Sequence, residues 1–430
     1  MKAEVKDFQE TSVIILSGRI DASTAPQLEE TLIDLMNKGK IQILINFKET
    51  DYISSGGLRV LLIVAKELKV RDGNLRLCHL NPNIYKIFKL AGFTVIFDIY
   101  ETEEEALTLR SEKPSMRIYF WGTRGSLPSS ITAEMVRAKI HKAIKEAQKR
   151  SLETDEAVVE FINNLPFSVR GSYGCNTSCV QIRGAEEYII CDAGTGLRDL
   201  GNYIMKSGKS PGIFHIFMSH LHWDHIQGFP FFTPAYIHSN QINVYGFHHE
   251  LEEVFTGQQD NPNFPVPLKA MSADIKFKVL ELDKEYEIAG FKIKGTKQNH
   301  PGDSFGYSFE RGGKRIVYST DAEHKKEAES EGYSFLDFFK NADLLIFDAQ
   351  YSLSDAIDIK ENWGHSSNLV GVELSVKAKV KRLCLFHNEP TCDDERLDRF
   401  LNDTREYLKI HAESYPLKID LAYDGLEIEV

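Results

Sequence analysis

"SHLHWDHIQG" occupies residues 219–228 and decides the fold of most of the chain. Four side chains that commonly bind metal ions fall within six consecutive positions: His220, His222, Asp224 and His225. Clustered imidazoles repel one another when protonated and need partners when buried, so this density requires an explanation. Imidazole and carboxylate ligands suit Zn²⁺ or another divalent first-row ion. The stretch therefore predicts a metal site, and an ordinary polar loop is the alternative.

The residues before the cluster indicate where the ligands lie in the fold. "GIFHIFMS" (212–219) is an apolar run of strand length that leads directly into them. The three histidines do not fit one helical face, and strand alternation ends at Trp223. A strand followed by a sharp turn and a helix start would bring them together. We therefore expect the cluster at the carboxyl end of a strand, where sites of α/β proteins lie.

This pattern, His-x-His-x-Asp-His, resembles the signature of the metallo-β-lactamase superfamily over about residues 116–430. The resemblance implies an αββα sandwich with one or two metal ions at the strand ends. It also implies distant ligands in "QNHPG", "VYSTDAEH" and "LCLFHNEP", and a supporting carboxylate in "IICDAGTG". The implied set is His220, His222 and His300 for one metal, Asp224, His225 and His387 for the other, Asp321 as the bridge, and Asp192 as support.

Two later segments resemble the phosphodiesterase branch of that superfamily, which includes ribonuclease Z and the phosphoribosyl cyclic phosphodiesterases. They are "ADLLIFDAQYS" (342–352) and "ENWGHSSN" (361–368). The resemblance implies that His365 donates a proton or polarises the phosphate, that Asp348 orients His365, and that Asp224 belongs to the catalytic group. A carboxylate stabilises the imidazolium form that can donate. Alternatively, this segment only caps a helix over 366–379, with Ser366 or Ser367 as N-cap.

Two further segments, "WGTRGSLPSS" (121–130) and "YGCNTSCVQI" (173–182), resemble active-site loops of the same branch. A helical insert at about 129–170 separates them, and it forms either a lid over the site or a solvated hairpin. The aromatics of "GFPFFTPAY" (228–236) line either a pocket for a base or a rigid core loop.

The N-terminal block, residues 1–110, alternates strand and helix and predicts a small open α/β domain. "SGRIDASTAPQLEETL" and "NFKETDYISSGGLRVLL" resemble the STAS domain of anti-sigma factor antagonists. That resemblance implies a protein partner and a phosphorylatable residue before the second helix. Gly56 occupies the usual acceptor position, so Ser54 and Ser55 are the regulatory candidates, and helix capping is their alternative role. The join between the domains is expected within 103–116, near Pro114.

Composition limits the remaining choices. The 430 residues carry a net charge of −12 and no basic cluster stands out, so a large nucleic-acid surface is not expected. No apolar run has the length of a membrane span, and the start of the chain is not a secretory leader. The six cysteines are sparse, which favours a reducing cytoplasm. Cys175 and Cys179 are more simply thiols than a metal clip.

We therefore expect an α/β protein in which a STAS domain precedes a dinuclear metal-dependent phosphodiesterase. Two divalent ions, Zn²⁺ or else Mn or Fe, would act on a small phosphodiester such as a cyclic nucleotide. The STAS domain would regulate or dock the enzyme through a protein partner, and a homodimer is a further option. The alternatives are a metal-bound signalling sensor without hydrolysis, and a thioester or lactone hydrolase.

Overall fold

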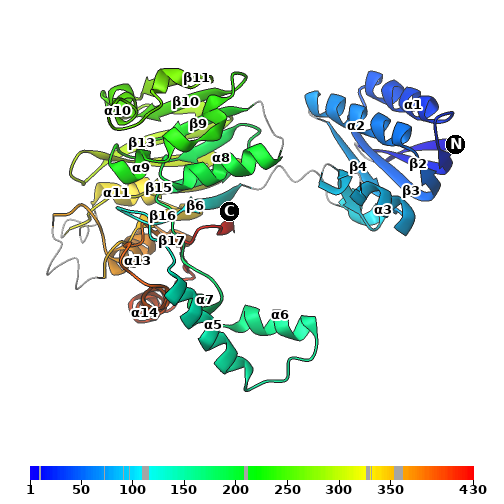
Figure 1. Cartoon of the computed structure of the whole chain (residues 1–430). Helices are drawn as coiled ribbons and strands as arrows, with labels where there is room; N and C mark the ends of the chain where they lie inside the picture. Colours follow the sequence, from blue (N-terminus) through cyan, green and yellow to red (C-terminus); the bar gives the residue numbers. More distant parts are fainter. Residues whose placement is uncertain are drawn as a thin grey trace. The chain divides into compact units, whose positions relative to one another are not determined.

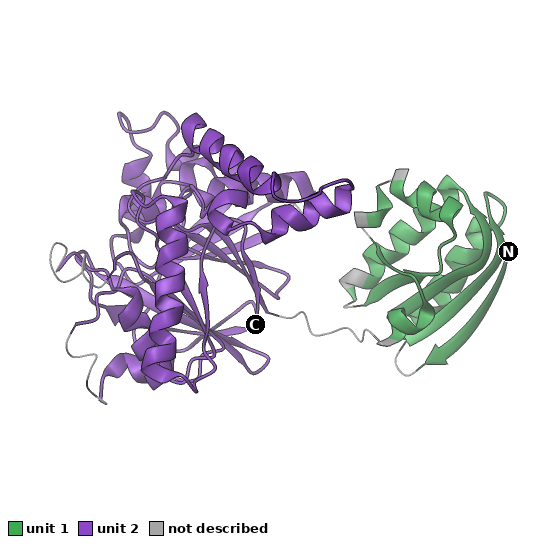
Figure 2. Ribbon diagram, turned by 90° about the horizontal axis from the view of Figure 1, so that it is seen from below, with its two compact units in different colours: residues 1–112 green, residues 113–430 purple. Residues whose placement is uncertain are grey.

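The computed structural model describes residues 1–8, 11–71, 73–90, 92–95, 97–108, 116–207, 212–325, 330, 332–352 and 362–430. The chain divides into two compact units, Met1–Glu112 and Lys113–Val430, which are coloured separately in Figure 2. The predicted join at Pro114 lies outside the described residues. Among the described helices, none is both long and apolar enough to pass through a bilayer.

The N-terminal unit is one sheet with helices on it. Its strands are β1 (Lys2–Phe8), β2 (Thr11–Ile20), β3 (Gln42–Ile53), β4 (Asn74–Cys78) and β5 (Asp98–Tyr100), hydrogen-bonded in that order. Its helices are α1 (Ala25–Asn37), α2 (Ser55–Val70), α3 (Pro82–Leu90) and α4 (Glu103–Thr108). Strands β2 to β5 are parallel, and β1 pairs antiparallel with β2. This confirms the predicted small α/β domain.

Two strands of this unit were not expected from the sequence. Strand β1 lies at the edge of the sheet and is exposed along most of its length, and its apolar alternation is limited to Ala3 and Val5 between charged residues. Strand β5 has three residues, too few for any period to appear. Pairing with β2 and β4 creates both strands, and such pairing is a tertiary effect.

The C-terminal unit contains two seven-stranded sheets (Figure 1). The first has the order β11-β10-β9-β8-β7-β6-β19 and the second β12-β13-β14-β15-β16-β17-β18. The first sheet comprises β6 (Arg117–Gly122), β7 (Cys179–Arg183), β8 (Tyr188–Cys191), β9 (Ile213–Phe217), β10 (Gln241–Gly246), β11 (Asp274–Val279) and β19 (Glu427–Glu429). The second comprises β12 (Tyr286–Ile288), β13 (Phe291–Gln298), β14 (Ser304–Arg311), β15 (Lys314–Ser319), β16 (Leu344–Asp348), β17 (Arg382–Phe386) and β18 (Lys418–Leu421).

Three apolar clusters hold these layers together. The central cluster joins the two sheets, with Phe120 and Phe217 from one and Tyr307 and Phe386 from the other. A second cluster packs helices on the first sheet, and a third packs helices on the second. The helices of this unit are α5 (Ala133–Ala147), α6 (Asp155–Asn164), α7 (Phe167–Arg170), α8 (Gly196–Ser207), α9 (Trp223–Ile226), α10 (Leu251–Gln258), α11 (Ser334–Phe339), α13 (Asn368–Lys377) and α14 (Asp394–Ala412). The predicted αββα sandwich is therefore confirmed.

The insert between the two loops forms α5, α6 and α7. Side chains of Thr132 and Thr154 cap α5 and α6. Helix α5 buries none of its residues. Its Lys139 reaches Asp394 at the start of α14, with Nζ 2.6 Å from a carboxylate oxygen. This contact and the packing of α7 on α14 fix the base of the insert.

The sheet topology brings distant segments to one edge. Strands β8 and β9 are parallel in the first sheet, and β15, β16 and β17 are parallel in the second. Strand β13 is antiparallel to β14, and β14 to β15, so β13 runs in the direction of β15. The residues that follow the carboxyl ends of these strands therefore meet at one edge of the sandwich.

Candidate metal centre

The motif 219–228 starts at the end of strand β9. The chain leaves the strand at Phe217, passes through His220 in an extended loop, and enters the single turn of helix α9. The turn is closed by the N–H of His225, which donates to the carbonyl of His222 at 3.0 Å. A strand end, a turn and a helix start therefore orient the four ligand-type side chains, as the sequence predicts.

The first half-site consists of His220, His222 and His300, each with a ring nitrogen within 4.8 Å of the others'. His300 follows strand β13, and its Nε2 lies 3.2 Å from Nδ1 of His222. The imidazole of His220 is fully buried, and its Nε2 has no hydrogen-bond partner. His222 is the exposed member.

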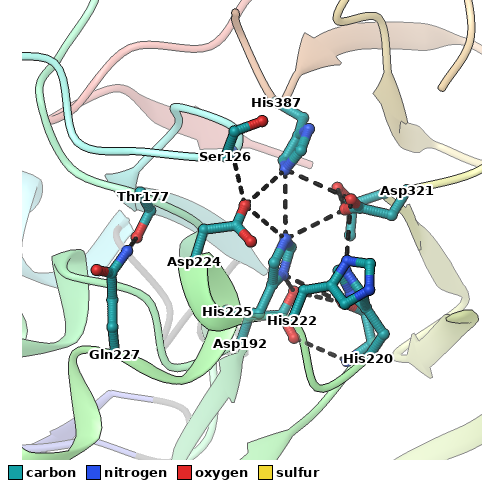
Figure 3. Close-up of polar contacts among 12 residues, drawn as sticks. Ser126, Thr177, Asp192, His220, His222, Asp224, His225, Gln227, Asp321 and His387 are labelled. Atoms are coloured by element: carbon teal, nitrogen blue, oxygen red, sulfur yellow. Dashed lines mark hydrogen bonds and ion pairs between the residues drawn. The ribbon is translucent and has the colours of Figure 1, made fainter. Parts of the chain in front are cut away.

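The second half-site consists of Asp224, His225 and His387, which meet the same distance criterion. Nε2 of His387 lies 3.3 Å from Nε2 of His225 and 3.3 Å from an oxygen of Asp224 (Figure 3). Asp321, after strand β15, lies between the half-sites. One of its oxygens is 3.6 Å from Nε2 of His220, and the other is 3.3 Å from Nε2 of His225. The carboxylate of Asp321 is therefore within reach of ligand atoms of both half-sites.

Hydrogen bonds at the outer nitrogens determine which ring nitrogens face the centre. Nδ1–H of His225 donates to Asp192 at 2.8 Å, and Nδ1–H of His300 donates to the carbonyl of Gly364 at 2.9 Å. Ser219 donates its hydroxyl to Asp192, so its oxygen accepts from Nδ1 of His220 at 3.2 Å. The inner nitrogens of His220 and His300 therefore carry lone pairs. Burial alone would lower the pKa of His225, but the carboxylates of Asp224 and Asp321 raise it well above its usual value, so a bound cation would displace a proton from this ring.

Lone pairs that face one another need a cation between them. Burial holds the pKa of His220 well below its usual value, so that ring is neutral. Burial opposes ionisation of Asp321, but His387 and the hydrogen-bonded His225 hold the pKa of its carboxyl well below the usual range. Neutral imidazoles and ionised carboxylates are the donor set that divalent metal ions require. The residues present therefore fit two metal ions.

Four residues at this edge have a left-handed backbone conformation. The φ angles are 62° for Ser126, 62° for Asp192, 53° for Asp321 and 65° for His387. A non-glycine residue in this region is strained by roughly 1–3 kcal/mol and persists where surrounding contacts require it. The backbone is therefore held in a costly geometry to direct these side chains inward.

His365 and Asp348 form a pair beside the cluster. Nδ1 of His365 is 2.8 Å from a carboxylate oxygen of Asp348, the last residue of strand β16. Burial alone would lower the pKa of His365, but the Asp348 carboxylate raises it above its usual value. The ring of His365 stacks on that of His387 at 5.1 Å, and its nitrogens also come within 4.8 Å of ligand atoms of His300 and Asp321. Ser367, not His365, caps helix α13.

Several residues of the centre were not predicted. The N–H of Ser126 donates to Asp224 at 2.7 Å, and the hydroxyl of Tyr318 donates to Asp192 at 2.7 Å. A Cβ on Gly125 would lie 2.5 Å from the ring of His387, so only glycine fits there. Ser126 and Gly125 belong to the quoted loop 121–130. Nothing in the sequence distinguishes Tyr318 from an ordinary strand residue.

Other candidates lie outside this centre. Ser54 caps α2, since its hydroxyl accepts from the N–H of Gly57 at 3.3 Å, and Ser55 is exposed at the start of the helix. Neither Cys175 nor Cys179 belongs to a metal-type group among the described residues. Of the aromatics in 228–236, Phe229 and Phe232 are fully buried, so that part of the segment is core.

Comparison with known proteins gives a different family match for each of the two units. Residues 187–388 match the model of the Beta-lactamase superfamily domain, and residues 2–106 match that of the STAS domain. The putative anti-sigma factor antagonist BtrV of Bordetella bronchiseptica is 36% identical over 106 residues, which are 25% of this chain and 91% of that protein.

The C-terminal unit has its own relatives. Ribonuclease Z of Thermoplasma acidophilum is 24% identical over 286 residues, which span 55% of this chain and 86% of that protein. The metallo-β-lactamase fold protein YhfI of Bacillus subtilis has a crystal structure that matches 74% of this chain and 100% of its own, at 17% identity and a TM-score of 0.49.

The fold, the buried His/Asp cluster and the two matching family models agree. The chain belongs to the STAS family through its N-terminal domain, and its C-terminal domain has the metallo-β-lactamase fold and matches the Beta-lactamase superfamily domain.

Proposed function

We propose that the C-terminal domain is a dinuclear metal-dependent phosphodiesterase that hydrolyses a small phosphodiester. The observation that carries this proposal is the His365–Asp348 pair beside the metal cluster. Seven ligand side chains alone would suit many hydrolases of this superfamily. An additional imidazole whose pKa is raised beside the cluster suits a reaction in which a leaving oxygen needs a proton.

In this proposal, one group of residues binds the metal ions and another donates a proton. Two bound divalent ions would supply an activated water and neutralise charge on the phosphate oxygens. His220, His222 and His300 would hold one ion, Asp224, His225 and His387 the other, and Asp321 would contact both. His365 would donate its Nε2 proton to the leaving oxygen or to a phosphate oxygen, while Asp348 holds its Nδ1–H. Zn²⁺ fits this donor set, and Mn and Fe are alternatives.

Asp348 is itself positioned to keep His365 oriented. Its oxygens accept the N–H of Ala322 at 3.2 Å and the N–H of Gln350 at 3.1 Å. It is fully buried, so the carboxylate cannot turn toward solvent. A fixed carboxylate selects the tautomer of His365 that has hydrogen on Nδ1.

The test uses metal-quantified protein and bis(p-nitrophenyl) phosphate with Zn²⁺ or Mn²⁺. We expect turnover that requires metal and that His222→Ala abolishes. His141→Ala is the matched control because His141 lies on the insert helix α5, outside the centre. Metal-replete protein that hydrolyses no phosphodiester would refute the proposal. Turnover confined to thioesters or lactones would favour that hydrolase class, and no turnover of any ester would favour a sensor.

We propose further that the STAS domain docks a protein partner and thereby regulates or locates the enzyme. The similarity to an anti-sigma factor antagonist supports this. Ser55, the first residue of α2, is exposed, whereas the hydroxyl of Ser54 caps the helix. A phosphate at a helix N-terminus is electrostatically favourable. Mass spectrometry after incubation with a cognate kinase tests whether either serine is phosphorylated. If neither carries phosphate, the result favours a docking or dimerising role for the STAS domain.

A further inference from the structure

Asp424 follows strand β18 and contacts two loops that are far apart in the sequence. One oxygen of its carboxylate accepts the N–H of Cys175 at 2.8 Å and the N–H of Asn176 at 2.9 Å. The other oxygen lies 3.0 Å from the hydroxyl of Thr123. A Cβ on Gly174 would lie 2.3 Å from this second oxygen, so only glycine allows so close an approach. One carboxylate therefore fixes the two loops relative to each other.

Backbone hydrogen bonds join these loops to a strand end of the metal centre. The carbonyl of Asn176 accepts the N–H of Thr123 at 2.9 Å. The carbonyl of Thr123 accepts the N–H of Asn388 at 2.9 Å, and the carbonyl of Asn388 accepts the N–H of Gly125 at 3.0 Å. Since Asn388 directly follows His387, the loop that contains Thr123 is bonded to the strand end that carries this ligand-type residue.

The same loop also touches the second half-site directly. The N–H of Ser126 donates to an oxygen of Asp224 at 2.7 Å (Figure 3). Gly125 packs so closely on His387 that a Cβ on it would lie 2.5 Å from the ring. Both contacted side chains belong to the group that would hold the second ion. A shift of this loop would therefore change the positions of Asp224 and His387.

The hydrogen bonds of Asp424 do not require its charge. The hydroxyl of Thr123 has one hydrogen but lies 3.0 Å from both the carbonyl of Tyr173 and the Asp424 oxygen. When Asp424 is protonated, its O–H donates to the Thr123 oxygen while the Thr123 hydroxyl donates to Tyr173. Burial raises the pKa of Asp424 to about 6 and favours this form, although its hydrogen bonds and Arg124 act in the opposite direction. An asparagine amide can make the same bonds, because its oxygen accepts the backbone N–H groups and its N–H₂ donates to Thr123.

We propose that Asp424 is a positioning residue of the metal centre, which holds the loop 123–126 and thereby keeps Asp224 and His387 in place for the second ion. The inference rests on the metal-dependent function proposed above and adds a residue outside the ligand set. Removing a residue that supports metal ligands typically weakens metal binding by about 10- to 100-fold. Because Asp424 acts through hydrogen bonds that an amide can also make, asparagine should fulfil the same role.

The test measures metal binding by the full-length protein and uses no substrate. In a Zn²⁺ titration against a competing chelator, Asp424→Ala should bind the second ion about 10- to 100-fold more weakly and the first ion as before. Asp424→Asn should retain the affinity of the unaltered protein for both ions. The visible absorption of bound Co²⁺ depends on ligand geometry, and it should change in the alanine variant only. Asp398→Ala is the matched control, since Asp398 accepts the hydroxyl of Tyr173 at 2.7 Å and the N–H of Ser168 in α7 at 3.0 Å.

A second variant perturbs the same contact from the other loop. Gly174→Ala should displace the Asp424 carboxylate and also weaken binding of the second ion, and it serves as the test if urea unfolding shows that Asp424→Ala is not folded. Unchanged affinity for the second ion in the folded variants would overturn the proposal. A loss in Asp424→Asn or in Asp398→Ala as large as that in Asp424→Ala would overturn it as well.

Metal binding and hydrolysis fail separately. If Asp424→Ala loses affinity for the second ion but the unaltered protein hydrolyses no phosphodiester, the positioning role stands and the proposed reaction fails. If the unaltered protein hydrolyses phosphodiesters and Asp424→Ala binds both ions with full affinity, the reaction stands and the positioning role fails.

Discussion

Asp192→Asn tests whether metal binding depends on a carboxylate outside the ligand set. Asp192 is fully buried, and its two oxygens accept four hydrogen bonds. The donors are the N–H of Ser219 at 2.7 Å, the hydroxyl of Ser219 at 2.8 Å, Nδ1–H of His225 at 2.8 Å and the hydroxyl of Tyr318 at 2.7 Å. This carboxylate therefore fixes the tautomer of His225 and, through Ser219, the orientation of His220.

Asparagine cannot reproduce this pattern in either orientation of its amide. The less costly orientation keeps the amide oxygen on His225 and Tyr318 and places the amide N–H₂ against the N–H of Ser219. A buried donor left without an acceptor costs about 1–3 kcal/mol. The Nδ1–H of His225 would then donate to a neutral amide oxygen in place of a negatively charged carboxylate. Replacing such a supporting residue typically weakens metal binding by about 10- to 100-fold, and we expect that decrease at the second half-site.

Competition between the metal-free protein and a chromogenic Zn²⁺ chelator measures this affinity, and urea unfolding measures stability separately. Asp343→Asn is the matched control. Asp343 is also nearly buried, and accepts from the N–H of Arg315 at 2.9 Å and from Nζ of Lys381 at 2.8 Å, but it lies outside the metal centre. The control should lose stability and keep its metal affinity. Unchanged affinity in Asp192→Asn, or the same decrease in both variants, would refute the reasoning.

Three further predictions follow from the same contacts. Chelating the metal should lower the melting temperature, since a ligand at a thousand times its Kd contributes about 4 kcal/mol; scanning fluorimetry that shows no change with EDTA would contradict this. His365→Ala should keep two metal ions per chain and lower kcat about 10²- to 10⁴-fold; loss of metal in an elemental measurement would instead make His365 a ligand. Gly57→Ala should destabilise the STAS domain by about 1–3 kcal/mol, because its Cβ would lie 2.6 Å from Cγ2 of Ile20, whereas Gly56→Ala has 3.5 Å to its nearest neighbour. Urea unfolding compares the two variants, and equal effects would count against the packing argument.

The sequence by itself determined the layers and the local chemistry. Apolar runs of strand length alternate with helical periodicity, and this is sufficient for two α/β units because burial follows those periods. The density of ligands in 219–228 was sufficient to predict a metal site, and the strand before it was sufficient to place that site at a strand end. These are short-range properties, which neighbours along the chain impose on each other.

The tertiary structure alone decided how the distant groups meet. The distances from Asp321 to His220 and His225 depend on strands from two different sheets, and no spacing along the chain fixes them. The inward lone pairs of His220 and His300 arise from hydrogen bonds at their outer nitrogens, which involve Ser219 and the carbonyl of Gly364. The left-handed backbone at the strand ends also appears only when packing enforces it.

The two exposed tryptophans show the same division. In the sequence, Trp223 marks the end of the strand alternation, and nothing there indicates how far Trp223 and Trp363 are exposed. In the structure, Trp223 is 66% exposed and Trp363 is 58% exposed. Sequence pattern determines which residues can be buried, but which of them remain exposed depends on where the loops end in three dimensions.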